Sequence, residues 1–146
     1  MIVYIDMDDV LCNYKDAHSK ALKQSPETPY PQSKRGFFAN LEPMKGALEA
    51  MEELYESSIY NPYILTAPST LNPLCYTEKR LWVEQWLGYK YVERLIISPN
   101  KGLLIGDILI DDHTTGNGQD KFGGRLIHYG SKLFPSWESV LKEMNI

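Results

Sequence analysis

The sequence predicts a single domain of the α/β class, built on a mainly parallel β-sheet. Short apolar segments alternate along the chain with segments whose apolar residues recur at helical spacing. The short segments are apolar nearly throughout, which is typical of strands in a parallel sheet that is covered on both faces. A chain of 146 residues is long enough to bury a substantial core.

Five segments are predicted as strands. The first has the sequence IVYI and contains only apolar residues. In chain order, the five predicted strands are 2–5, 63–66, 94–97, 107–111 and 125–129. Residues 113–124 contain four glycines, which predicts a loop or a hairpin between the last two strands.

Four segments are predicted as helices. In residues 46–56 the spacing places Ala47, Met51 and Leu54 on one face. The other three predicted helices are 14–24, 75–87 and 136–144. Residues 25–43 contain too many prolines for a long helix and are predicted to be irregular.

Composition and charge exclude several classes of function. The net charge is −4, from 15 basic and 19 acidic residues, so the chain lacks the basic surface that binds duplex nucleic acid. No run approaches the roughly 18 apolar residues of a membrane span. We see no signal peptide, and Cys12 and Cys75 lack the spacing of a metal site. We therefore expect a cytoplasmic protein with reduced thiols.

The first predicted strand runs directly into three carboxylates, Asp6, Asp8 and Asp9. Carboxylates held close together repel one another unless a positive charge lies between them. In a parallel α/β sheet, the carboxyl ends of the strands lie along one edge, and ligands bind there. The question is then which other groups stand at strand ends.

Later strands end in groups of complementary chemistry. Thr66 ends the second strand, Lys101 follows the third, and Asp111 and Asp112 end the fourth. Carboxylates suit a hard cation such as Mg²⁺. A hydroxyl, backbone N–H groups and a lysine suit a phosphate. Each group alone is typical of a turn or a surface position, but the set in this order predicts phosphoryl transfer.

These residues resemble the four motifs of the haloacid dehalogenase superfamily: "DMDDVL" (6–11), Thr66, Lys101 and "DD" (111–112). Within it, the chain resembles the 5′(3′)-deoxyribonucleotidases in three stretches, "GFFANLEPMKGA" (36–47), "EKRLWVEQWLG" (78–88) and "GDILIDD" (106–112). The resemblance implies a Rossmann-like three-layer sandwich. It also implies one hydrolase domain over residues 1–146, with a small cap inserted after the first strand at about residues 12–45.

The resemblance implies a role for each motif residue. Asp6 would be the nucleophile and Asp8 the general acid and base. Thr66 and Lys101 would hold the phosphoryl oxygens. The Mg²⁺ ligands would be the Asp6 carboxylate, the Asp8 backbone carbonyl and a carboxylate of the pair 111–112. Of this pair we favour Asp111 for direct contact, because it ends the strand, with Asp112 binding directly or through water.

Further residues are candidates for substrate binding. The backbone N–H groups of Met7 and Ala67 are expected donors to phosphate; the family commonly has Ser where this chain has Ala67. Phe37 and Phe38 are expected to stack on a nucleobase, or alternatively to fill the junction between cap and core. Lys79 is a weaker candidate, for which we expect a surface position.

The sequence therefore predicts a Mg²⁺-dependent phosphomonoesterase that acts through an aspartyl-phosphate. The expected partner is a small phosphomonoester, and the best match is a (deoxy)nucleoside monophosphate. We expect binding to neither nucleic acid nor a membrane. A homodimer is left open. Two alternatives remain: a phosphatase for a sugar or cofactor phosphate, and a non-catalytic protein that binds a phosphate ligand.

Overall fold

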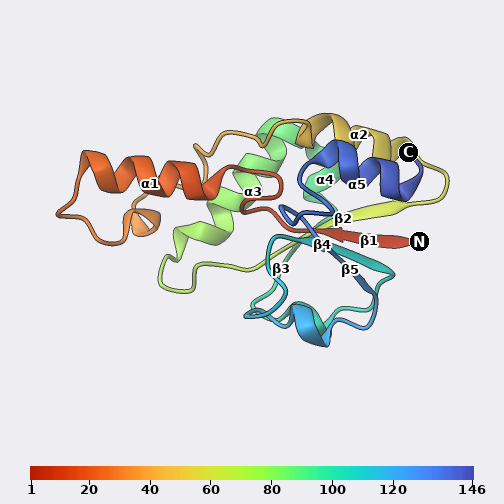
Figure 1. Ribbon diagram of the computed structural model, residues 1–146. Coiled ribbons are helices and arrows are strands. Elements are labelled where there is room, and N and C mark those ends of the chain that lie inside the picture. The colour runs from red at the N-terminus through yellow and green to blue at the C-terminus, as the bar shows by residue number, and fades with distance from the viewer.

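The computed structural model describes residues 1–146 and contains one sheet of five strands (Figure 1). The strands are β1 (Ile2–Ile5), β2 (Asn61–Thr66), β3 (Leu95–Ile97), β4 (Ile108–Asp111) and β5 (Arg125–His128). Their order is β3-β2-β1-β4-β5, and every neighbouring pair is parallel. The first strand therefore lies in the centre of the sheet, as expected for a Rossmann-like fold.

Most helices lie between successive strands. The α-helices are α1 (Tyr14–Gln24), α2 (Ala47–Glu56), α3 (Leu74–Leu87), α4 (Tyr89–Val92) and α5 (Trp137–Met144). Three short 3-10 helices are η1 (Pro31–Ser33), η2 (Lys101–Leu103) and η3 (Gln119–Lys121). No helix is both long enough and apolar enough to cross a membrane.

The two faces of the sheet are covered unequally. Alternate strand residues point to opposite faces, so Val3 and Ile5 join a core of 25 buried residues that includes the inner faces of α2, α3 and α5. Tyr4 points the other way, into a cluster of four buried residues that includes Phe122. Figure 1 shows the larger helices on one side of the sheet and only loops with a short helical turn on the other. The third layer of the sandwich is therefore thin.

The predicted α/β fold is confirmed, and the predicted strands and helices agree with the structure to within one or two residues at most ends. One alternative was wrong: residues 113–124 are not a hairpin, because β4 and β5 are parallel. The four-residue helix α4 and the 3-10 helices were not predicted, because segments this short carry no readable periodicity.

Residues 12–45, which we call the cap segment, extend from one end of the molecule (Figure 1). They comprise α1, η1 and irregular chain. None of the residues in α1 is fully buried. Just before the segment, Asp9 has a φ of 59° and its carboxylate accepts a hydrogen bond from the Lys15 N–H at 2.8 Å. Asp9 thus caps the first turn of α1. The division into core and cap stays a prediction.

Candidate active site

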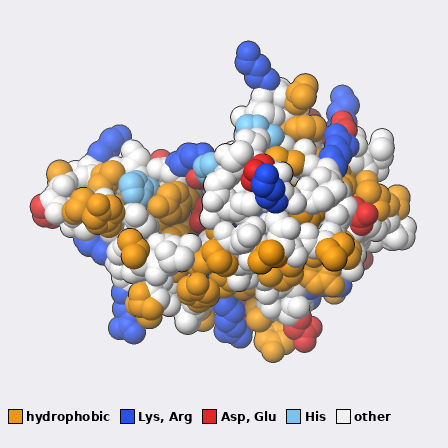
Figure 2. Space-filling model, turned by 90° about the horizontal axis from the view of Figure 1, so that it is seen from below, with side chains coloured by type: hydrophobic (Ala, Val, Ile, Leu, Met, Phe, Trp, Pro, Cys, Tyr) orange, Lys and Arg blue, Asp and Glu red, His pale blue; other side chains and the backbone are white.

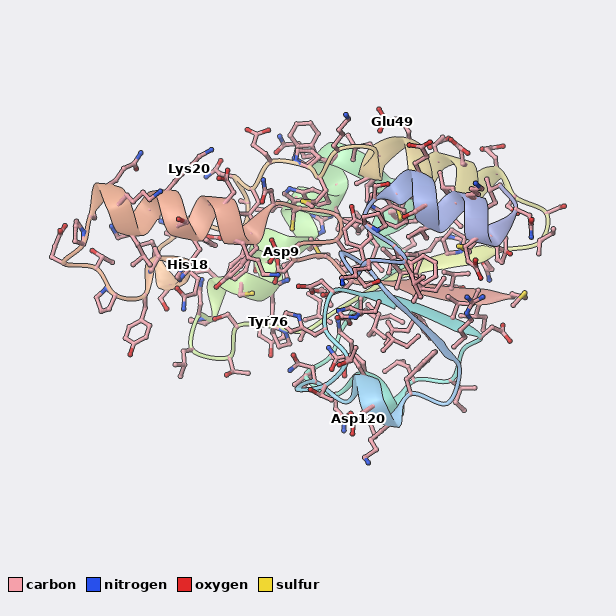
Figure 3. All side chains as sticks on the ribbon, in the orientation of Figure 1. Asp9, His18, Lys20, Glu49, Tyr76 and Asp120 are labelled. Atoms are coloured by element: carbon pink, nitrogen blue, oxygen red, sulfur yellow. The ribbon has the colours of Figure 1, made fainter.

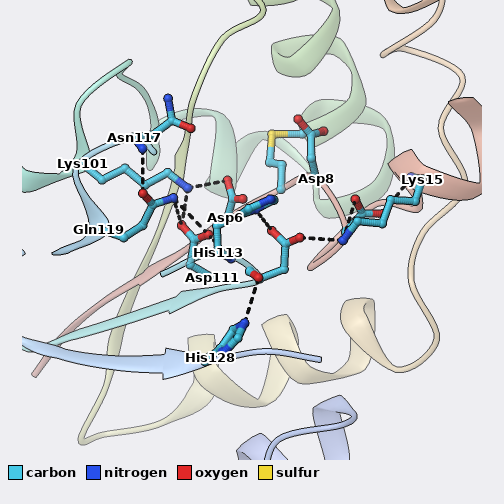
Figure 4. Close-up of polar contacts among 12 residues, drawn as sticks. Asp6, Asp8, Lys15, Lys101, Asp111, His113, Asn117, Gln119 and His128 are labelled. Carbon is cyan, nitrogen blue, oxygen red and sulfur yellow. Dashed lines mark hydrogen bonds and ion pairs between the residues drawn. The ribbon is translucent and has the colours of Figure 1, made fainter. Parts of the chain in front are cut away.

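The sheet brings the strand-end residues to one edge. Asp6 directly follows β1 and donates its N–H to the Ile110 carbonyl at 2.9 Å, so it lies beside the end of β4. Thr66 ends β2, and Asp111 ends β4. Lys101 begins η2, four residues after the end of β3. Figure 4 shows Asp6, Lys101 and Asp111 converging from separate elements.

Lys101 joins two of the carboxylates. Its Nζ lies 2.8 Å from Asp6 Oδ1 and 2.5 Å from Asp111 Oδ2. The side chain is almost completely buried. Burial alone lowers the pKa of Lys101, but Asp6 and Asp111 outweigh burial and raise its pKa, so the ammonium stays charged. One lysine therefore offsets part of the repulsion between the ends of β1 and β4.

The loop after β4 holds Asp111 from the other side. The Asp111 carboxylate accepts hydrogen bonds from the His113 N–H at 2.9 Å and from Gln119 Nε2 at 3.3 Å. Gln119 is itself oriented by the Asn117 N–H, which donates to its Oε1 at 2.8 Å. Sequence reasoning missed Gln119, because a single amide in a glycine-rich loop gives no local signal.

Lys79 corrects one expectation. We expected it on the surface, but its side chain is 1% exposed. Its Nζ lies 2.9 Å from Asp8 Oδ2 and 2.7 Å from Thr66 Oγ1. Asp8 and Thr66 therefore meet through this ammonium.

The spacing in α3 contains the signal that places Lys79 inside. Its buried positions recur at i, i+3 and i+4: Cys75, Glu78, Lys79, Trp82 and Val83. Lys79 precedes Trp82 and Val83 by three and four residues, so all three lie on the face that packs against the sheet. The charge of Lys79 had suggested the opposite face.

Asp6 lies in an environment that disfavours its charge. The pKa of Asp6 is raised to about 6: burial is the largest cause, Lys101 opposes it, and the neighbouring Asp111 and Asp8 add to it. Four carboxylates with lysine partners lie at this edge: Asp6, Asp8, Asp111 and Asp112. Of these lysine partners, only Lys79 and Lys101 are buried.

The donor set fits a divalent cation. The carboxylates outnumber the buried ammonium groups, and carboxylate and carbonyl oxygens are the ligands that Mg²⁺ prefers. The backbone carbonyl of Asp8 accepts no hydrogen bond within the protein, so it is available as a further oxygen ligand. Asp111, Asp112 and His113 each offer a ligand atom within 4.8 Å of the others.

Asp111 and Asp112 differ in their partners. Asp111 is fully buried and bound by buried groups. Asp112 accepts instead from two exposed side chains, Lys15 at 2.9 Å and His113 Nδ1 at 2.8 Å. Exposed partners are displaced by a cation more readily than buried ones. Our assignment of direct metal contact to Asp111 stays a prediction, and Asp112 is the more accessible carboxylate.

Two backbone donors at the edge have no partner. The N–H groups of Met7 and Ala67 donate no hydrogen bond within the protein. Met7 directly follows Asp6, and Ala67 directly follows Thr66, the two site residues at the ends of β1 and β2. Unpaired N–H groups of this kind are suitable donors to the oxygens of a phosphate.

The aromatic residues of the cap segment pack together beside Lys79. Phe38 is 3% exposed, and Lys79 Nζ lies 5.2 Å from its ring centre. Phe38 therefore fills the junction between cap and core, the alternative that we had left open, and its predicted contact with substrate is untested. Phe37 is half-buried and packs edge-on against Tyr14, with ring centres 5.5 Å apart.

His18 extends this cluster. Its ring stacks on Tyr14 with centres 5.6 Å apart, and its Nε2 lies 3.1 Å from Gln32 Oε1. Figure 3 shows His18 on the opposite side of α1 from Lys20. On that side, Figure 2 shows a histidine between hydrophobic side chains at the cap end of the molecule. Tyr14, His18 and Phe37 thus form a partly exposed aromatic surface.

The five-stranded parallel sheet is the Rossmann-like fold that the resemblance to the haloacid dehalogenase superfamily predicted. The fold agrees with a crystal structure of the provisionally assigned HAD-hydrolase YfnB from Bacillus subtilis bound to magnesium. The TM-score is 0.68, and the match covers 99% of this chain and 98% of that one. At 12% sequence identity, this likeness concerns the fold alone.

Sequence comparison identifies the family. Residues 28–134 match the family "5′ nucleotidase, deoxy (Pyrimidine), cytosolic type C protein". A provisionally named 5′(3′)-deoxyribonucleotidase of Vibrio phage KVP40 is 43% identical over 143 residues, which cover 96% of this chain and 82% of that protein. The cytosolic-type human 5′(3′)-deoxyribonucleotidase is 40% identical over 106 residues, 73% of this chain.

The chain belongs to the 5′(3′)-deoxyribonucleotidase family, and enzymes of that name are phosphoric monoester hydrolases. The predicted resemblance is thereby confirmed. The match to the human protein covers 47% of that protein's length, so this chain spans about half of it.

Proposed function

We propose that this protein is a cation-dependent phosphomonoesterase that hydrolyses deoxynucleoside monophosphates. The observation that carries the proposal is the pairing of two carboxylates with two buried lysines at one sheet edge. Asp6 is held by Lys101, and Asp8 is held by Lys79. Family membership supports the reaction class.

In the first step, a carboxylate oxygen of Asp6 attacks phosphorus and the bond from phosphorus to the ester oxygen breaks. Asp8 gives its proton to the departing oxygen, which leaves as the alcohol. The product is an aspartyl-phosphate on Asp6. Lys101 orients Asp6 for this attack through its 2.8 Å contact.

In the second step, water attacks the same phosphorus and Asp8 takes its proton. The bond between phosphorus and Asp6 breaks, which restores the carboxylate and releases phosphate. Thr66, Lys79 and the N–H groups of Met7 and Ala67 surround the place where phosphoryl oxygens bind, and stabilise their negative charge.

The residues that would hold Mg²⁺ are Asp6, the carbonyl of Asp8 and the pair Asp111–Asp112. When bound, the cation supplies positive charge that offsets the repulsion between Asp6 and an anionic phosphate. Two observations indicate that these residues suit the cation: the carboxylates outnumber the buried ammonium groups, and the Asp8 carbonyl accepts no hydrogen bond within the protein.

The aromatic surface supports a substrate with a base. Tyr14 and Phe37 lie next to Phe38, whose ring faces Lys79. Stacking of a base on an aromatic side chain contributes about 1–3 kcal/mol in nucleic-acid sites. Relatives of this chain carry the name of deoxyribonucleotidases, in agreement with this arrangement.

The test is turnover by the purified protein. We expect Mg²⁺-dependent release of phosphate from deoxynucleoside monophosphates, stopped by EDTA. Asp6→Asn should lower kcat by a factor on the order of 10⁴ or more, because removal of a nucleophile of this kind removes most of the catalysis. The matched control is Asp120→Asn, an exposed residue of η3, which should keep wild-type activity.

Other outcomes point to the alternatives. If sugar phosphates exceed every nucleotide in kcat/KM, the protein is a phosphatase of another substrate class. If no phosphomonoester is hydrolysed with Mg²⁺, Mn²⁺ or Co²⁺, while nucleotide still binds, the protein is a binding protein that retains the fold.

A further inference from the structure

Glu78 is a buried carboxylate that the proposed reaction does not use. It lies on α3 directly before Lys79 and is only 6% exposed. No lysine, arginine or histidine lies within ion-pair distance of it. A buried charge without a cation is costly unless hydrogen bonds satisfy it, so its partners must account for its position.

Both oxygens of Glu78 bind backbone N–H groups of the cap segment. The Gly36 N–H donates to Oε1 at 2.6 Å, and the Phe38 N–H donates to Oε2 at 3.0 Å. These two donors flank Phe37, so the carboxylate bridges the backbone on either side of that aromatic residue. Hydrogen bonds to an ionised carboxylate are about twice as strong as neutral ones.

The bridged segment is further restrained. Gly36 has a φ of +86°, which a glycine adopts readily. Its carbonyl accepts from Asn40 Nδ2 at 2.7 Å. One turn along α3 from Glu78, Trp82 donates its Nε1–H to the Leu41 carbonyl at 2.7 Å. The face of α3 thus holds residues 36–41 at both ends.

The same face of α3 also holds the phosphate site. Lys79 binds Asp8 and Thr66, while its neighbour Glu78 binds the segment that carries Phe37. Two adjacent residues of one helix therefore set the position of the aromatic surface relative to the catalytic edge. A nucleotide must span these two places, whereas a phosphomonoester without a base needs only one.

We propose that Glu78 is a positioning residue for nucleotide selectivity: it orients Phe37, and through Phe37 the base-binding surface, without contacting the substrate. The proposal rests on the function proposed above. The proposal has a specific consequence. Loss of the Glu78 bridge should weaken binding of the nucleotide's base and leave the chemistry at Asp6 unchanged.

The experiment compares two substrates that differ only by the base: a deoxynucleoside monophosphate and 2-deoxyribose 5-phosphate. Glu78→Gln keeps the shape of the side chain, but its amide NH₂ would face a backbone N–H. We expect kcat/KM for the nucleotide to fall about tenfold or more, mainly through KM, since a charge-assisted hydrogen bond is lost. For deoxyribose phosphate we expect a change below about twofold.

Two controls sharpen the comparison. Glu84→Gln replaces an exposed glutamate of α3, and both substrates should be used as by the wild type. In a double-mutant cycle with Phe37→Ala, the two losses on the nucleotide should not add, because Glu78 acts through Phe37. If Glu78→Gln is unfolded at the assay temperature, Glu78→Asp, which keeps the charge but shortens the reach, takes its place.

The proposal is overturned if Glu78→Gln loses the same factor on both substrates, or if its loss adds fully to that of Phe37→Ala. Unchanged nucleotide kcat/KM in a folded variant overturns it too. If the wild-type protein hydrolyses no phosphomonoester, the proposed function fails instead. In that case the inference is judged by nucleotide affinity, which Glu78→Gln should still weaken relative to deoxyribose phosphate.

Discussion

At the scale of single residues, the site is dominated by carboxylates that lysines only partly neutralise. Asp6 is bound by Lys101, yet its pKa is still raised to about 6, since burial is the largest influence on it. A nucleophile must be ionised to attack. The geometry therefore calls for additional positive charge at this edge, which the cation proposed above would supply.

The raised pKa of Asp6 predicts how stability depends on pH in metal-free protein. A carboxyl whose pKa is higher in the folded state stabilises the fold below its unfolded pKa of about 4, and this contribution is lost as pH rises through about 6. Asp6→Asn removes the charge. Near pH 8 it should therefore be more stable than the wild type, by on the order of 2 kcal/mol.

Urea unfolding in EDTA at pH 4 and at pH 8 measures this difference. The difference in the free energy of unfolding between Asp6→Asn and the wild type should be smaller at pH 4 than at pH 8. Adding Mg²⁺ at pH 8 should also narrow it, because the cation stabilises wild-type protein more than the variant. A variant that is less stable than the wild type at pH 8 in EDTA would show that ionised Asp6 is well compensated by Lys101.

At the scale of elements, the start of helix α5 supports the loop that carries site residues. α5 begins with a capping box: the Ser139 N–H donates to Ser136 Oγ, and the Ser136 N–H donates to Ser139 Oγ. The next residue, Trp137, is buried and donates its Nε1–H to the Val10 carbonyl at 2.9 Å. The start of α5 thus supports the loop that follows Asp6 and Asp8.

Ser136→Ala should destabilise the fold by about 1 kcal/mol, the usual effect of losing a helix cap. Thermal or urea unfolding measures this loss. Ser19→Ala is the matched control, because Ser19 lies exposed within α1 and its side chain makes no hydrogen bond. The control should be neutral or slightly stabilising, since alanine has the higher helix propensity. Equal effects of the two substitutions would refute a capping role for Ser136.

At the scale of the whole molecule, stability is unevenly distributed. The central strands and α2, α3 and α5 share the main core. α1 has no fully buried residue, and only Tyr14 and Ala17 of this helix pack against that core. Regions with few buried apolar contacts open with lower free energy than the core. The cap segment should therefore open locally while the sheet stays folded.

Amide hydrogen exchange tests this distribution. Without ligand, amides of residues 18–24 should exchange at least about tenfold faster than those of β1 and β2, whose opening requires global unfolding. A bound nucleotide should slow exchange in the cap segment more than in the sheet, because the proposed function places its base on the aromatic surface. Equal protection of α1 and β1 would mean that cap and core unfold as one unit.

Much of this architecture could be predicted from the sequence. The order of strands and helices is encoded locally, because apolar residues at a spacing of two or of three to four decide which face is buried. Asp6, Thr66 and Asp111 meet for a simple reason: each stands at the end of a strand, and parallel strands end at one edge. No knowledge of long-range contacts is needed for either inference.

The tertiary structure alone decided which partners the polar residues at this edge have. Lys79 is buried against Asp8 and Thr66, Gln119 supports Asp111, and Glu78 holds the segment around Phe37. Except for Gln119 and Asp111, the partners lie far apart along the chain, and a lysine or a glutamate is usually exposed unless it finds a partner. Local patterns in a sequence indicate how strongly each residue prefers water. Only the folded structure shows which charged groups lie close enough to one another to compensate for the loss of contact with water.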